Sequence, residues 1–228
     1  MRKQIDPILK RRLASLRYSD PETLLQEVLP NIETILQKPD LAKYIPPKQR
    51  KDWLEKYQAA FLGFMMKHSM RSIAVVTVCV QEDNEFDKRD DFDCVLKAVI
   101  QGGETAYKPV QLKQFPSHEV NARAEIQTEI NKLQKYGSSS TLVVAFWINR
   151  DTKLDLGQFN FDHLTIEQLW FFGDSPRGDI TLHGGTMPDL CSGICWAGRI
   201  ENGKPVVRPW RFKPKPSTDK AATIAGQD

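Results

Sequence analysis

Hydrophobic residues in the first 70 positions recur at helical spacing. The run Ser19–Glu22 predicts a helix start, because Ser19 can cap, the proline suits the first turn and the glutamate completes a capping box. Apolar residues then recur every three or four positions from Leu24 to Ile35. The pair Pro46–Pro47 starts a second helix, which runs to about residue 68 and whose broad apolar face predicts burial in a core.

The hydrophobic period then changes to that of strands. Ser72–Val80 is rich in β-branched residues and predicts a buried strand. Phe92–Ile100 and Tyr107–Phe115 follow, and the Gly-Gly pair between them indicates a hairpin of antiparallel strands. Helical spacing returns over Asn121–Tyr136. The continuous apolar run Leu142–Ile148 predicts a central strand buried on both faces.

The C-terminal third adds fewer signals. Ile166–Phe172 is a further strand candidate, and Gly184–Gly193 has the composition of a loop. An Asn-Gly pair between Ile194–Ile200 and Pro205–Trp210 predicts a second hairpin. The predicted class is α/β, in the α+β sense, with a central mixed sheet flanked by helices and a C-terminal β-hairpin. We expect a helical extension over residues 1–45, one domain over 46–212 and a disordered tail over 213–228.

Composition narrows the class of protein. The chain has 228 residues with 32 Lys and Arg against 29 Asp and Glu, which excludes a histone-like polycation. No apolar run reaches the ~18 residues of a membrane span, so we expect no membrane partner. Cys79 and Cys94 lie in strand-like runs, where free buried thiols are common, and a disulfide scaffold is not expected. We therefore expect a cytoplasmic protein.

One group of residues has the composition of a chemical site. Asp93 stands at the head of one predicted strand, and Gln111 and Lys113 lie two apart on the next, so that they share a face. A hairpin can bring all three together. Carboxylate, amide and backbone carbonyl oxygens are ligands of Mg²⁺, and a lysine can hold a water and offset charge on a phosphate.

Such a site needs a second carboxylate to hold the metal. Glu55, on the helix before the first strand, is the best donor, and Asp91 is an alternative because it can share a face with Asp93. The metal ligands expected are then Asp93, Glu55, Gln111 and the carbonyl of Leu112. The expected cofactor is Mg²⁺ or Mn²⁺, which polarises a phosphodiester and activates a water.

The passage from Asp93 to Lys113 resembles the core of the PD-(D/E)XK nuclease superfamily, in a variant form D…QxK. The likeness covers roughly residues 50–150, with the order helix, strand, hairpin, helix, strand. It implies a restriction-endonuclease-like core and a metal-dependent nuclease acting on nucleic acid, with DNA as the expected substrate. Asp93 and Glu55 would be metal-binding acids and Lys113 the catalytic lysine. Gln111 departs from the family, because it stands where the family has Asp or Glu and cannot ionise.

Other interpretations of these residues stay open. Asp93 can belong to a solvated acidic turn, and Gln111 and Lys113 to the polar face of a half-exposed strand. Glu55 can pair with Lys51 or Lys56 on its own helix. The alternative function is a degenerate, non-catalytic nuclease fold that binds nucleic acid or a protein. The long helical N-terminus also suggests a homodimer or a protein partner docked through those helices.

Weaker signals lie elsewhere in the chain. His183, Cys191 and Cys195 suggest zinc, but the C-x₃-C spacing has no second Cys pair and no fourth ligand. His118 follows the second strand of the motif and could face a phosphate. The C-terminal segment 196–215 interleaves Arg and Lys with Trp and Phe, a composition that suits either stacking on nucleic acid or an ordinary hairpin.

Overall fold

The computed structural model describes residues 5–70, 73–80, 86, 91–116, 118, 120–136, 141–148, 150, 156–174, 179–187, 194–201 and 204–209. The α-helices are α1 (Pro7–Ala14), α2 (Pro21–Gln37), α3 (Pro39–Ala42), α4 (Pro47–Ser69) and α5 (Ile126–Asn131). Short 3₁₀ turns are η2 (Lys132–Tyr136) and η3 (Leu156–Gln158). The strands are β1 (Ile73–Val80), β2 (Cys94–Ile100), β3 (Thr105–Phe115), β4 (Val143–Ile148), β5 (Gln168–Asp174), β6 (Asp179–Thr186), β7 (Ile194–Glu201) and β8 (Lys204–Pro209).

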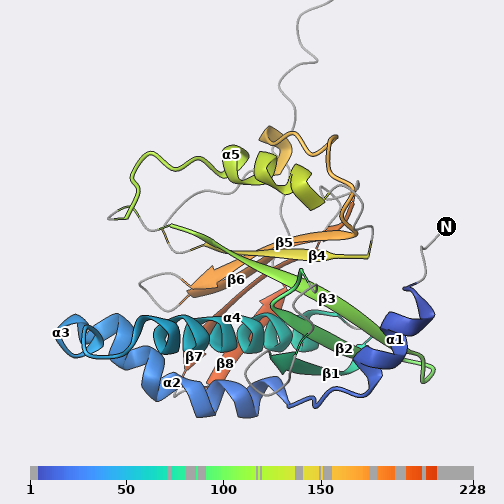
Figure 1. Ribbon diagram of the computed structural model, residues 1–228, viewed down its shortest axis with the longest axis horizontal. Coiled ribbons are helices and arrows are strands. Elements are labelled where there is room, and N and C mark those ends of the chain that lie inside the picture. The colour runs from blue at the N-terminus through green and yellow to red at the C-terminus, as the bar shows by residue number, and fades with distance from the viewer. Residues whose placement is uncertain are drawn as a thin grey trace, which may run out of the picture.

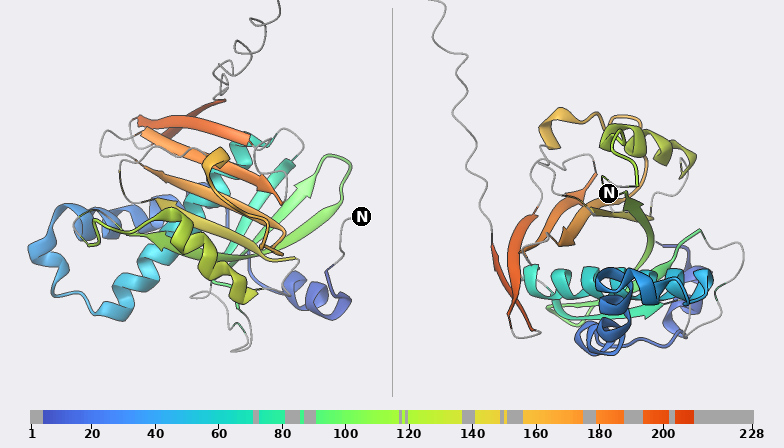
Figure 2. Two further views of the ribbon diagram at one scale, coloured as in Figure 1. Left: turned by 90° about the horizontal axis from the view of Figure 1, so that it is seen from above. Right: turned by 90° about the vertical axis from the view of Figure 1, so that its left-hand side faces the viewer.

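All these strands join one mixed sheet, and they stand in it in the order of the sequence. β1, β2 and β3 are antiparallel neighbours, whereas β3, β4 and β5 run parallel. From β5 to β8 the pairing is antiparallel again. The sheet curls around α4, as Figure 2 shows from two sides. The mixed α/β class is therefore confirmed, with helices at the N-terminus followed by a curled mixed sheet.

Helices cover both faces of the sheet (Figure 1). On the concave face, α2 and α4 pack on alternate residues of β1 to β6 and form the larger core, which includes Phe61, Trp147 and Trp170. On the opposite, convex face, α5 and η2 pack on the other set of residues, among them Phe115 and Phe146. β4 is buried along its whole length, as its continuous apolar sequence predicts.

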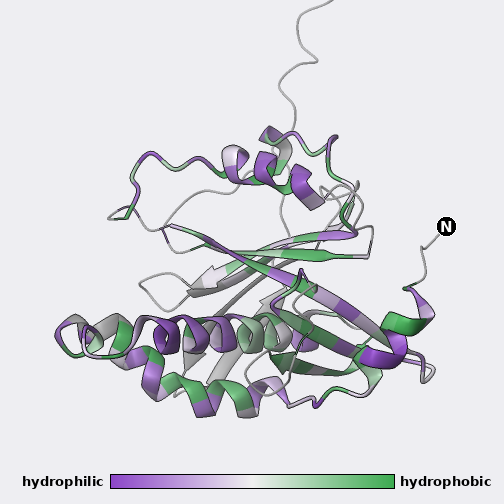
Figure 3. Ribbon diagram, viewed as in Figure 1, coloured by the Kyte–Doolittle hydropathy of each residue, from purple (hydrophilic) through white to green (hydrophobic). Residues whose placement is uncertain are grey.

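Helix α4 changes character along its length, and this change places the site. Its N-terminal half is hydrophilic and its C-terminal half hydrophobic (Figure 3). In the apolar half, Gly63 lies so close to β1 that a Cβ there would overlap the side chain of Val78. Close packing at Gly63 therefore fixes α4 against the sheet, and the polar half extends past the ends of β1 and β2 toward β3.

The start of α2 differs from the prediction. Asp20, not Ser19, caps the helix: its Oδ1 accepts hydrogen bonds from the backbone N–H groups of Glu22 (2.9 Å) and Thr23 (3.3 Å). Glu22 does not complete a capping box, because its carboxylate contacts Lys67 (3.2 Å) and His68 (3.1 Å) of α4. These contacts tie the two helices together.

Other sequence predictions have mixed outcomes. The hairpin of β2 and β3 is confirmed, with positive φ at Gly102 (110°) and Gly103 (87°). The predicted helix over residues 121–136 is wrong at its start, because only 126–131 is α-helical and 132–136 is a 3₁₀ turn. The predicted loop from Gly184 is wrong at its first residues, since β6 extends to Thr186 and pairs with β5 and β7. Hydrogen bonds to two neighbouring strands outweigh the low β-propensity of glycine there.

Three further predictions concern the thiols, the C-terminus and the membrane. Cys79 and Cys94 are free and buried, as predicted. The C-terminal hairpin is confirmed as the antiparallel pair of β7 and β8. The predicted disordered tail, 213–228, lies outside the described residues. Among the helices described, none is both long and apolar enough to cross a membrane.

Candidate functional site

The candidate site lies at a notch in the sheet. β2 begins at Cys94, which pairs with Val110 of β3, and the ladder ends on a hydrogen bond from the backbone N–H of Asp93 to the carbonyl of Val110 at 2.9 Å. β3 continues for another five residues to Phe115, and among the described strands these residues pair only with β4 on the other side. Its edge toward β2 is therefore open from Gln111 onward. Groups from both faces of the sheet can meet at this open edge.

Asp93, the residue before β2, closes part of that edge. The backbone N–H of Leu112 donates to Asp93 Oδ2 at 2.7 Å. The side-chain amide of Gln111 donates to the same oxygen. Burial raises the pKa of Asp93, although these hydrogen bonds and the nearby charges of Lys113 and Lys51 act in the opposite direction. Asp93 is thus a partly buried carboxylate aimed at β3, unlike a residue of a solvated acidic turn.

Gln111 is held between two groups. Its side chain is only 7% exposed. Its amide nitrogen donates to Asp93, and its Oε1 accepts a hydrogen bond from the hydroxyl of Tyr136 at 3.3 Å. A polar side chain that is buried and held by two hydrogen bonds does not belong to the solvated face of a half-exposed strand. The alternation of polar residues on β3 therefore has a specific structural cause.

Tyr136 is the residue of this site that sequence reasoning missed. It ends η2 and packs in the convex core. Its ring also lies under two cations, with Lys113 Nζ 5.6 Å and Lys135 Nζ 4.8 Å from the ring centroid. The signal in the sequence was faint: Tyr136 stands at the last position of the predicted helix over 121–136. The turn of η2 then brings it over β3.

Lys113 lies on the same convex side of β3 as Gln111 and Phe115, as the two-residue spacing predicts. Its positive charge opposes the effect of burial, which on balance raises the pKa of the Asp93 carboxyl. The structure therefore brings Asp93, Gln111 and Lys113 together, one from the head of β2 and two from β3.

Glu55 reaches the same place from the other face of the sheet. It lies in the polar half of α4 and forms an i,i+4 ion pair with Lys51 (3.3 Å), as one of the sequence interpretations expected. Lys56, the other expected partner, instead binds Glu27 of α2 at 3.1 Å. The pKa of Glu55 is raised, first by burial and then by the negative charge of Asp93. The two carboxylates are thus electrostatic neighbours despite their separate elements.

Asp91, the alternative second carboxylate, has a different setting. It is exposed to solvent, and its charge is a minor cause of the raised pKa of Lys135 at the end of η2, after the hydrogen bond and the charge of Tyr136. Glu55 is partly buried and under the influence of Asp93. The geometry therefore favours Glu55 over Asp91 as the second acid.

These groups include donors for a hard divalent cation. Within the described residues, no set of three or more His, Cys, Asp and Glu side chains is placed to hold a metal. Two carboxylates, those of Asp93 and Glu55, need neutral oxygens to complete such a site, and Gln111 Oε1 and the carbonyl of Leu112 are the nearest by position on β3. Both carboxylates are partly buried, and the negative charge of Asp93 helps to raise the pKa of Glu55. A cation suits this place, because its positive charge would stabilise the ionised form of both groups.

The orientation of the Gln111 amide sets one condition on metal binding. The nitrogen faces Asp93 and the oxygen faces Tyr136. A half-turn of the amide exchanges the two, and the hydroxyl of Tyr136 can then accept instead of donate. After this rotation the Gln111 oxygen faces Asp93, and these oxygens can then hold a cation together. In the observed arrangement, the uncharged amide donates a hydrogen bond to the Asp93 carboxylate in place of a cation.

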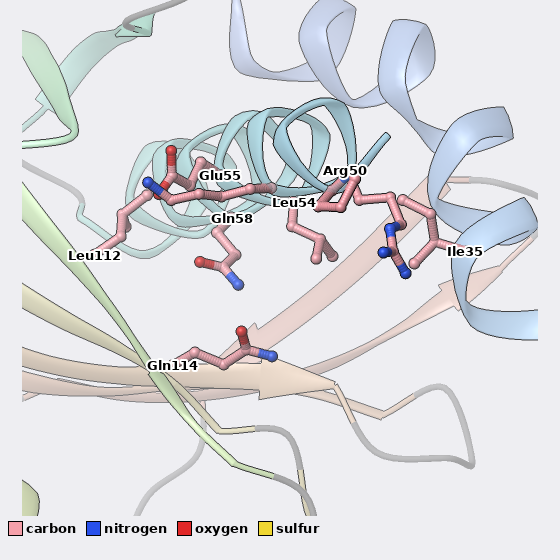
Figure 4. Close-up of a pocket in the computed structure, with 9 residues that line it drawn as sticks. Ile35, Arg50, Leu54, Glu55, Gln58, Leu112 and Gln114 are labelled. Carbon is pink, nitrogen blue, oxygen red and sulfur yellow. The ribbon is translucent and has the colours of Figure 1, made fainter. Parts of the chain in front are cut away.

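A pocket adjoins this site on the concave face (Figure 4). Its volume is about 400 Å³, and residues of α4, the end of β3 and Ile35 of α2 line it. Glu55 and Leu112 belong to both the pocket and the candidate site. The site is therefore continuous with a space large enough for part of a substrate.

The weaker sequence candidates have other settings or lie outside the described residues. His118 is an exposed turn residue. Burial lowers the pKa of His183, which lies on β6. Cys191 and the side chain of Cys195 lie outside the described residues, as do the side chains of the basic and aromatic segment 196–215.

The comparisons with known proteins find no relative. No protein-family model, curated protein or solved structure matches the chain.

Proposed function

We propose that this protein is a divalent-cation-dependent nuclease that hydrolyses phosphodiester bonds in DNA, with the notch beside β3 as its active site. The observation that supports this most is the meeting of Asp93, Gln111 and Lys113 with Glu55, which comes from the opposite face of the sheet. Two acids, an amide and a lysine at one sheet edge form a set suited to metal-assisted phosphodiester hydrolysis.

The order of elements adds support. α4, β1, the hairpin of β2 and β3, α5 and β4 follow one another as the resemblance to the PD-(D/E)XK nucleases implies. β2 runs antiparallel to β3, and β4 runs parallel to it. Under this proposal the region from α4 to β4 is a restriction-endonuclease-like core.

Each residue has a distinct role in this proposal. Asp93 and Glu55 hold Mg²⁺ or Mn²⁺ together with the carbonyl of Leu112 and, after rotation of its amide, Gln111. The cation, when bound, stabilises negative charge on the phosphate. Lys113 orients the attacking water and offsets the charge that develops on the phosphate oxygens.

Tyr136 supports this arrangement from outside the reaction. Its hydroxyl holds Gln111 and its ring contacts the Lys113 ammonium group. It is therefore a positioning residue, because it acts on the substrate only through its two neighbours.

A second candidate function rests on the same amide. The nitrogen of Gln111 faces Asp93, so a neutral side chain occupies the place of a charged metal ligand. This favours a nuclease fold that has lost its metal and binds nucleic acid or a protein instead. Exposed apolar side chains lie on α1 (Ile8) and, at the opposite end of the molecule, around α3 (Leu41 and Tyr44), and each end is a separate place for a protein partner or a second copy of the chain.

Cleavage of DNA separates the two functions. Purified protein is incubated with linear, circular and single-stranded DNA in Mg²⁺ or Mn²⁺, beside an EDTA sample and a Lys113→Met variant. The nuclease proposal predicts cleavage that EDTA abolishes and that the variant loses. Lys132→Met, an exposed lysine of η2 paired with Glu129, is the matched control and retains activity. Equal products from wild type and Lys113→Met would assign any cleavage to a contaminant and favour the second candidate.

A further inference from the structure

The pocket beside the candidate site has a polar interior. Helix α4 contributes Arg50, Lys51 and Gln58, and β3 contributes Gln114. Figure 4 shows the amides of Gln58 and Gln114 pointing toward each other across the space. Glu55 lies at the end near Leu112, and the guanidinium of Arg50 lies at the other end, near Ile35.

Arg50 carries a donor without an acceptor. Its Nε is buried and has no hydrogen-bond partner within the described structure. A buried guanidinium N–H of this kind is costly unless something accepts from it. Arg50 also lines the pocket, so its guanidinium group is placed beside any oxygen-bearing ligand that enters there. Phosphate oxygens match the fork of donors that arginine presents.

The rest of the lining suits a nucleobase better than a bare anion. Gln58 is 4% exposed, and side-chain amides pair with the donor and acceptor edges of bases. Leu54 and Ile35 provide apolar surface for the face of a base. The volume of about 400 Å³ lies within the ~300–1,000 Å³ typical of small-ligand pockets.

We propose that this pocket receives one unpaired nucleotide of the substrate strand, next to the phosphodiester at Asp93, and that the enzyme therefore acts on single strands or strand ends. This inference rests on the proposed nuclease function. A base within a duplex is stacked on both sides and paired along its edge, so it cannot enter a pocket of this size unless it is extruded. Arg50 binds the phosphate of that nucleotide, and the amides of Gln58 and Gln114 contact the base.

The test measures binding without cleavage. Fluorescence anisotropy in EDTA compares a short fluorescein-labelled DNA strand, whose sequence cannot pair with itself, with the duplex of that strand and its complement, closed at both ends by a non-nucleotide linker. Wild type is expected to bind the single strand at least about tenfold more tightly than the duplex. Arg50→Met loses about tenfold in affinity for the single strand. Lys48→Met, a change in the first turn of the same helix outside the pocket, keeps both affinities.

Competition identifies what the pocket recognises. Thymidine monophosphate is expected to displace the labelled strand from wild type more effectively than inorganic phosphate does. The inference is overturned if strand and duplex bind with equal affinity, or if Arg50→Met binds the single strand as tightly as wild type. Equal competition by inorganic phosphate would overturn it as well. Because EDTA prevents metal-dependent cleavage, these results are independent of the nuclease assay. If the protein prefers single strands but cleaves no DNA in Mg²⁺, nucleotide binding in the pocket is supported and the proposed nuclease activity is contradicted.

Discussion

Asp93 and Leu112 are joined by a hydrogen bond of 2.7 Å, from the backbone N–H of Leu112 to the Asp93 carboxylate, at the point where β2 stops pairing with β3. The carboxylate thus takes a position that a further residue of β2 would have filled. Because β2 ends there, Glu55 and Lys51 on α4 and Lys113 and Gln111 on β3 all act on one acid. The notch in the sheet, more than any one side chain, makes the site.

Replacing Asp93 by asparagine tests the burial of the carboxylate. The pKa of Asp93 is raised in the folded protein, so its contribution favours folding most at low pH, and this contribution is lost as the pH rises through the folded pKa. Without metal, Asp93→Asn should therefore have a higher Tm than wild type at neutral pH, and the difference should shrink near pH 4. Thermal unfolding in EDTA at several pH values measures it. A difference that does not depend on pH would contradict the raised pKa.

Replacing Gln111 by glutamate adds a second negative charge beside Asp93. In EDTA the variant should lose about 1–3 kcal/mol in the free energy of unfolding, since the amide donor is replaced by a like charge. Mg²⁺ should recover this loss, and cleavage should rise roughly tenfold, which corresponds to about 1.4 kcal/mol in barrier height. Urea unfolding with and without Mg²⁺ gives the first result, and initial cleavage rates give the second. Destabilisation that Mg²⁺ does not reverse would indicate that no cation binds there.

Replacing Lys113 by methionine removes the charge and keeps most of the apolar stem. Cleavage should fall by roughly 100-fold or more, as when a group that stabilises transition-state charge is lost. The change should leave the fold intact, because Lys113 contacts the surface of the Tyr136 ring and is only partly buried. Rates are compared with those of Lys132→Met, and circular dichroism checks the fold. A loss of less than threefold would rule out the proposed role.

Replacing Tyr136 by phenylalanine keeps the ring under Lys113 and removes the hydroxyl that donates to Gln111. The buried Oε1 loses its partner, at a cost of about 1–3 kcal/mol. If Gln111 is a ligand, the variant should need more Mg²⁺ for half-maximal cleavage while its rate at saturating Mg²⁺ changes little. A purely structural role would lower stability and leave the Mg²⁺ dependence as in wild type.

Replacing Gly63 by alanine tests how α4 is fixed against the sheet. The added Cβ overlaps the side chain of Val78, so the free energy of unfolding should fall by about 1–3 kcal/mol. A double variant with Val78→Ala should be less destabilised than the sum of the two single changes. Chemical denaturation of the four proteins in this cycle measures the coupling. Additive effects would place the strain elsewhere.

The pattern of the sequence predicts much of this fold. The β-branched and apolar runs predict β1 to β3, and the Gly-Gly pair predicts the hairpin between β2 and β3. These predictions hold because each depends on residues that are close together in the sequence. β6 was missed as a whole, because glycines such as Gly184 and Gly185 have low β-propensity, which pairing with β5 and β7 outweighs in the fold. The early start of the predicted helix over 121–136 was wrong, because spacing of apolar residues does not show where helical hydrogen bonds begin.

The candidate site was predictable in part. Alternation on β3 placed Gln111 and Lys113 on one face, and the hairpin brought Asp93 to them. Tyr136 and the open pocket at Arg50 depend on how η2 and α4 pack, which no local spacing encodes. The direction of the Gln111 amide likewise follows from its tertiary partners.

Binding of Mn²⁺ tests the central claim most directly, because the metal separates a nuclease from a degenerate copy of its fold. Isothermal titration of Mn²⁺ into the metal-free protein should show one saturable site. Asp93→Asn and Glu55→Gln should each weaken that site by about tenfold or more, whereas Asp91→Asn should not. Titrations in which wild type and Asp93→Asn are indistinguishable would contradict the account, and the notch would then hold a structural carboxylate capped by Gln111 and Leu112.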